Sequence, residues 1–89
     1  MKELIKRLLD ARRDGLNIAG EIYTENGTIN IRHCFSLINT TLSDESIEIK
    51  DGDFEFYLDQ KCVKDCQYYS SQDCYNIVTD TINLSLTFV

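Results

Sequence analysis

The sequence predicts an α+β domain in which an N-terminal helix packs on an antiparallel sheet of five to six strands. The first residues follow a helical apolar period, whereas most of the remaining chain alternates apolar and polar residues as strands do. Two turn signals, Asn26-Gly27 and Asp51-Gly52, interrupt that alternation. Successive hairpins form a meander, which either stays open with one polar face or curls into an open barrel. We expect residues 1–89 to form one domain, since this length suffices for one small core.

Residues 2–14 are expected to form the helix. Its apolar stripe consists of Leu4, Ile5, Leu8 and Leu9. Gly15 follows at the position where a left-handed residue commonly ends a helix. A helix of about 13 residues is only marginally stable alone, so this one must pack on the sheet.

Residues 17–38 are expected to form the first hairpin, with Asn26-Gly27 in its turn. On the face expected to be buried, this register pairs Ile18 with Phe35, Gly20 with His33, Ile22 with Ile31 and Thr24 with Ile29. On the other face Glu21 meets Arg32, a favourable cross-strand pair. Both faces are therefore consistent with the turn.

A polar connection at 39–45 leads into the second hairpin, residues 46–58. A two-residue turn at Asp51-Gly52 places four apolar residues on the buried face, namely Ile47, Ile49, Phe54 and Phe56. The same register sets Glu48 opposite Glu55 on the outer face, an unfavourable pair. Either a function favours an acidic outer face here, or Lys50 offsets the repulsion.

Residues 59–73 break the strand alternation, so we expect a short helix, capped by Asp59, or a structured loop. Residues 74–88 form the third hairpin, with a turn at Thr79-Asp80. This turn pairs Val78 with Thr81, Ile77 with Ile82 and Tyr75 with Leu84. The clean alternation of the last strand runs through Ile82, Leu84, Leu86 and Phe88.

Charge is concentrated in the second hairpin. The whole chain has a net charge of −6, which argues against direct binding to nucleic acid because phosphates need a basic surface. Between 44 and 59, carboxylates outnumber the single cation, Lys50. This stretch is either a well-solvated face or a docking surface for a basic partner, in which a tyrosine beside carboxylates would suit Arg or Lys. The expected partner-binding residues are Asp44, Glu45, Glu48, Asp51, Asp53, Glu55, Tyr57 and Asp59.

The cysteines and the single histidine form only a loose metal-binding pattern. Its members are Cys62, Cys66 and Cys74, with His33 or Cys34 to complete four ligands. Free thiols that pack as small apolar side chains are the simpler interpretation, and His33 then fits opposite Gly20. No catalytic motif is present, so we expect a protein without enzymatic activity or cofactor. The N-terminus lacks the apolar core of a signal peptide and no run suits a membrane span, which favours a cytoplasmic protein.

A small, acidic, proline-free chain of this class resembles the inhibitors that phages and mobile elements carry, such as anti-CRISPR and anti-restriction proteins. The residues that carry the resemblance are Asp44, Glu45, Glu48, Asp51, Asp53, Glu55 and Asp59. The resemblance implies an inhibitor whose acidic hairpin docks on a basic, nucleic-acid-binding site of a host defence protein. The alternatives are an accessory domain that self-associates through sheet edges and a zinc-stabilised module.

Overall fold

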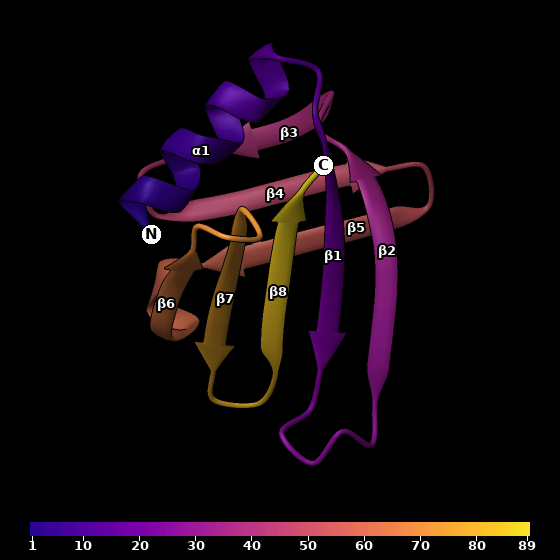
Figure 1. Cartoon of the computed structure of the whole chain (residues 1–89), viewed down its shortest axis with the longest axis vertical. Coiled ribbons are helices and arrows are strands. Elements are labelled where there is room, and N and C mark those ends of the chain that lie inside the picture. The colour runs from indigo at the N-terminus through magenta and orange to yellow at the C-terminus, as the bar shows by residue number, and fades with distance from the viewer.

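The computed structural model describes residues 1–89 and confirms the α+β class, with one helix and eight antiparallel strands (Figure 1). The elements are α1 (Lys2–Arg13), β1 (Asn17–Tyr23), β2 (Asn30–Ser36), β3 (Asn39–Leu42), β4 (Ser46–Asp51), β5 (Phe54–Asp59), η1 (Gln60–Cys62), β6 (Val63–Tyr69), β7 (Cys74–Thr79) and β8 (Asn83–Phe88). They form two sheets, one with the order β2-β1-β8-β7-β6 and one with the order β3-β4-β5. The expected strand number was therefore too low, and neither sheet closes into a barrel.

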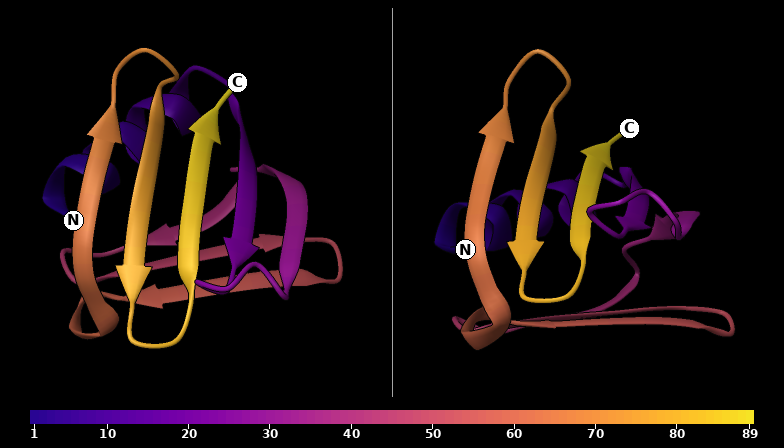
Figure 2. Two further views of the ribbon diagram at one scale, coloured as in Figure 1. Left: turned by 60° about the horizontal axis from the view of Figure 1, so that its bottom comes forward. Right: turned by 90° about the horizontal axis from the view of Figure 1, so that it is seen from below.

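The large sheet forms one layer, and both α1 and the small sheet lie against its inner face (Figures 1 and 2). The strands of the small sheet run across those of the large sheet. The core between the layers includes Leu4, Leu8 and Ala11 of α1, Ile18, Phe35, Ile77, Leu84, Leu86 and Phe88 of the large sheet, and Ile47, Ile49, Phe56 and Leu58 of the small sheet. Each sheet thus buries apolar side chains of its inner face. The exception is the end of the first hairpin, where Ile29 and Ile31, both expected to be buried, are about half exposed.

The helix ends at Arg13, one residue before the expected end, and Gly15 follows with the expected positive φ, +72°. Its buried stripe differs from the expectation at one position, because Leu9 is exposed and Ala11 is fully buried. Residues three and four apart share a helix face, so Ala11 continues the line from Leu4 and Leu8 while Leu9 falls at the border of that face.

The first hairpin has the predicted register throughout, including the Glu21–Arg32 pair, whose Oε2 and Nε atoms are 3.0 Å apart. Gly20 is required here for a packing reason. A Cβ atom at this position would overlap the ring of Phe35, so the ring fills the space above the glycine. His33 is opposite Gly20, as expected. Its side chain lies beside the ring of Phe35 and is only half-buried.

The second and third hairpins keep the predicted faces but slip by two residues. In the second, Ile49 pairs with Phe56 and the turn is Gly52-Asp53, where only Gly52 has positive φ. Such a turn needs one left-handed residue at its first position, whereas the expected turn would also have forced Asp51 to positive φ. In the third, Ile77 pairs with Leu84. Because side chains alternate with period two, a slip of two leaves each of them on the same face.

Two segments expected to lack strands contain them. Residues 39–42 of the expected polar connection form β3, and the middle of 59–73 forms β6 (Val63–Tyr69) rather than a helix or loop. Only η1 is helical, and the Asp59 carboxylate caps it as expected by accepting from the Lys61 N–H at 2.9 Å. Both missed strands are at sheet edges, where a strand needs little apolar alternation to pair with its neighbour.

Candidate functional site

The outer face of the small sheet carries Tyr57 between acidic side chains. Tyr57 is 61% exposed and faces Glu48 across the strand pair. Glu55 faces Lys50, and the Nζ atom of Lys50 is 3.5 Å from the Oε1 atom of Glu48. The expected Glu48–Glu55 opposition is therefore wrong, because the two-residue slip replaces a repulsive pair with a compensated one.

The other acidic residues of the expected site are spread along the hairpin. Asp44 and Glu45 are exposed in the connection between β3 and β4, at one end of the small sheet. Asp53 is exposed in the turn at the opposite end, roughly 17 Å away for strands of this length. Asp59 is half-buried and occupied as the cap of η1. Only Glu48, Glu55 and Tyr57 share the centre of the outer face.

Asp51 is on the inner face, contrary to its expected role in partner binding. Its Oδ2 atom accepts from the Ser36 N–H at 3.0 Å and is 4.0 Å from Nε2 of His33. The imidazole of His33 stacks on the ring of Phe54 with a centroid distance of 4.4 Å. These contacts join β2 to the β4–β5 turn, so His33 and Asp51 have structural partners that explain them.

The structure does not bring together the residues of the alternative metal-binding pattern. No group of three or more His, Cys, Asp or Glu side chains is placed to hold a metal ion. Cys34 and Cys62 are exposed, and Cys74 is buried with its Sγ atom 3.1 Å from Oγ of Ser85. Burial raises the pKa of the Cys66 thiol, which favours the protonated form over the thiolate that metals bind.

A cluster that the sequence did not predict joins α1 to the turn before β7. The guanidinium of Arg7 donates to both carboxylate oxygens of Asp73, and the hydroxyl of Tyr68 donates to Oδ1 at 2.9 Å. These bonds, first that of Arg7, lower the pKa of Asp73 below its usual value. Arg7 also lies over the ring of Phe88, 4.4 Å from its centroid. No sequence spacing links residues so far apart, so only the fold reveals this anchor.

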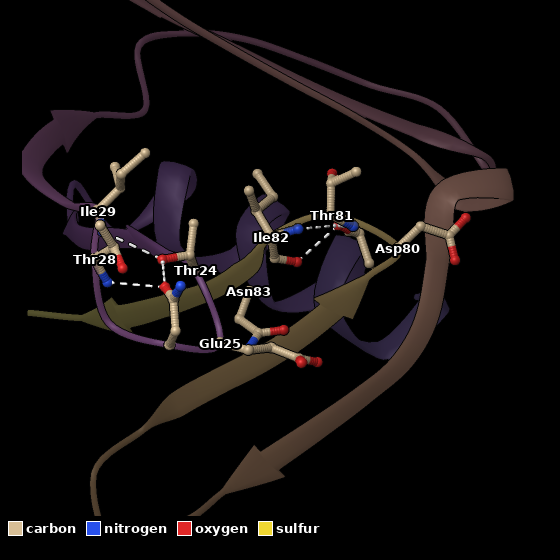
Figure 3. A pocket seen from close by; sticks show the side chains of 10 residues that line it. Thr24, Glu25, Thr28, Ile29, Asp80, Thr81, Ile82 and Asn83 are labelled. Atoms are coloured by element: carbon tan, nitrogen blue, oxygen red, sulfur yellow. Dashed lines mark hydrogen bonds between the residues drawn. The ribbon is translucent and has the colours of Figure 1, made fainter.

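Two hollows flank the turn between β7 and β8. One opens between this turn and the β1–β2 loop, and its lining is mostly polar (Figure 3). Two of its hydroxyl groups are already bonded within the loops: the Thr24 hydroxyl donates to Asn26 at 2.8 Å, and the Thr79 hydroxyl to the Ile82 carbonyl at 2.7 Å. These hydrogen bonds stabilise the two loops, so they do not indicate a ligand site.

The other hollow is an apolar groove of about 530 Å³ between β5 and the ends of β7, β8 and β1. Its apolar lining includes Ile22, Phe56, Leu58, Ile82 and Leu84. Its acidic rim consists of Glu55, Asp59 and Asp80. The groove thus combines an apolar floor with a negatively charged border, and it adjoins Tyr57.

The edge of β5 beside this groove has no strand partner, because β5 ends the order of the small sheet. The Gln60 N–H donates to the Glu45 carbonyl at 2.8 Å, in line with the β4–β5 register. Bonded and non-bonded pairs alternate along antiparallel strands, so Glu55 and Tyr57 point their backbone N–H and C=O groups away from β4. No bond outside the sheet ladders engages these groups.

Comparison with protein-family models, with curated proteins and with solved structures finds no match to this chain. None of its helical segments has the length and apolar content of a membrane-spanning helix.

Proposed function

We propose that this protein binds a basic protein partner through the outer face of β4 and β5 and has no catalytic role. The proposal extends to an inhibitor that occupies the nucleic-acid-binding site of a host defence protein. The observation that carries it is Tyr57, an exposed aromatic ring opposite Glu48 on a hydrogen-bonded strand pair. An exposed tyrosine among carboxylates suits an arginine or lysine side chain, which gains an ion pair and cation–π contact together.

The charge of the chain supports the same kind of partner. The net charge is −6, and Lys50, the one cation of the hairpin, is within ion-pair distance of Glu48. No other carboxylate of the small sheet is within ion-pair distance of a lysine or arginine. Such a surface attracts basic proteins over about 10 Å at moderate salt, and its association slows as salt screens the charges.

A pair of charge-reversal variants tests the proposal. One changes Glu48, Asp53 and Glu55 of the small sheet to Lys, and the matched control changes Glu3, Asp14 and Asp65, which lie elsewhere on the surface. The net charge of each variant rises by six, so a general charge effect would act on both equally. Folding of each is first verified by circular dichroism.

Wild type and both variants are used as bait in nuclease-treated lysates of candidate hosts, and any retained protein is purified and titrated. We expect wild type and the control to bind one nucleic-acid-binding protein in competition with its nucleic acid, and the small-sheet variant to lose it. Equal retention by all three proteins, or retention by none, would show that the acidic face serves solvation.

Self-association is the second candidate, because the unpaired edge of β5 could accept another strand. Sedimentation velocity over a range of concentrations distinguishes the two. A monomer at all concentrations excludes self-association and leaves the heterologous partner.

A further inference from the structure

The inner face of the large sheet is longer than the layer that covers it. Figure 1 shows β1, β2, β7 and β8 extending past β5, the last strand of the small sheet. On this uncovered end, Ile29 is 56% exposed and Ile31 is 48% exposed, and Ile22 and Ile82 are partly buried. Ile31 pairs with Ile22, and Ile22 and Ile82 both line the groove, so Ile31, Ile22 and Ile82 form an apolar strip next to it.

The small sheet stops one strand short of covering this strip. Adjacent strands lie about 4.8 Å apart and packed sheets about 10 Å apart, so one strand added to the free edge of β5 would run over the strip as a second layer. The edge is ready for pairing, since the N–H and C=O groups of Glu55 and Tyr57 face the groove without partners.

We propose that an extended segment of the basic partner pairs with the free edge of β5 as a fourth strand of the small sheet. This inference rests on the proposed function and specifies how the partner is recognised. Main-chain hydrogen bonds to Glu55 and Tyr57 supply affinity, while alternate side chains supply specificity. The segment's inward residues are apolar and cover Ile22, Ile31 and Ile82. Its outward residues are lysine or arginine and lie beside Glu55, Tyr57 and Asp59.

The charges along β5 favour a basic segment over a second copy of this chain. If two copies paired antiparallel through their β5 edges about Tyr57, Glu55 of one copy would face Asp59 of the other at both ends of the pairing. Like charges directly opposite each other on paired strands are destabilising. A segment with alternating basic residues converts the same positions into ion pairs.

The test uses the full chain, isotope-labelled for NMR, and a short capped peptide of alternating lysine and valine as the probe. A peptide of alternating glutamate and valine is the control. We expect the basic peptide to slow hydrogen exchange at the amides of Glu55 and Tyr57 by about tenfold or more, because pairing removes them from water. Amides at the free edges of β2, β3 and β6 should be unaffected.

Two further peptides, N-methylated on either all lysines or all valines, separate edge pairing from attraction to the acidic face. An added strand directs every second N–H toward β5, so one of the two methylated peptides should lose binding and the other should retain it. If both bind and the exchange at Tyr57 is unchanged, the peptide contacts the face alone; the edge inference is then overturned while the proposed function stands. Absence of binding by the unmethylated peptide, or exchange protection that grows with protein concentration alone, also overturns it.

Discussion

The two ends of β2 differ in burial although they share one strand and one sheet face. Phe35 is 2% exposed, whereas Ile31 is 48% exposed. The difference lies in what covers them. Phe35 packs against the rings of Phe54 and Phe56 in the small sheet, whereas the other end of β2 extends past β5 (Figure 1). Alternation therefore indicates which side chains could be buried, and the extent of the second layer decides which of them are.

The covered end should dominate stability. Replacing Ile18 with Ala removes a fully buried side chain of β1 and leaves a cavity in the core. We expect a loss of about 3 kcal/mol in the free energy of unfolding, measured by urea denaturation. A loss below about 1 kcal/mol would mean that the two layers pack less tightly than the burial of Ile18 indicates.

The register of the first hairpin could be predicted because its Asn-Gly turn and its cross-strand pairs agree, but the burial of Ile29 and Ile31 could not. The other two slipped because more than one turn position is compatible with the same buried face. β3 and β6 were missed because edge strands such as 39–42 carry too few apolar residues to alternate clearly. The split into two sheets depends on how hairpins pack on each other, which no local pattern contains.

The candidate site was only partly predictable for the same reason. The acidic outer face with Glu48, Glu55 and Tyr57 follows from alternation and survives the slip. Asp51 could not be placed correctly, because its position depends on one turn residue. The groove beside β5 was invisible from sequence, since it is formed by strands of both sheets.

Removing the contact between Arg7 of α1 and Asp73 should reduce stability by weakening the packing of α1 at the covered end of the large sheet. We expect Arg7→Ala to cost about 1 kcal/mol, because the ion pair with Asp73 and the contact with Phe88 are both lost but the pair is partly exposed. Thermal denaturation measures the effect. Arg13→Ala is the matched control on the same helix, since Arg13 is exposed, and an equal loss in both variants would refute a specific role for Arg7.

The same pair makes a pH-dependent contribution. The pKa of Asp73 is lower in the folded protein than in the unfolded chain, where it is about 4. Its stabilising effect is therefore complete above about pH 4 and is lost as the pH falls through the folded pKa. We expect wild type to lose more stability than Arg7→Ala between pH 5 and pH 2, measured by urea denaturation at each pH. Parallel curves would show that Asp73 does not contribute through Arg7.

The smallest effect on stability is expected at the uncovered end of the large sheet. Substitutions there should instead affect binding of the partner segment. Ile31→Thr removes exposed apolar surface while keeping a β-branched side chain, so unfolding should change by no more than about 0.5 kcal/mol. Ile38→Thr is the control, because Ile38 is 81% exposed and lies between β2 and β3, away from the groove. If a strand of the partner covers the isoleucine strip, Ile31→Thr should weaken binding of the lysine–valine peptide several-fold and Ile38→Thr should not. Equal affinity of both variants would mean that the strip stays exposed to solvent in the complex. The apolar residues of the peptide would then contact only the groove beside β5.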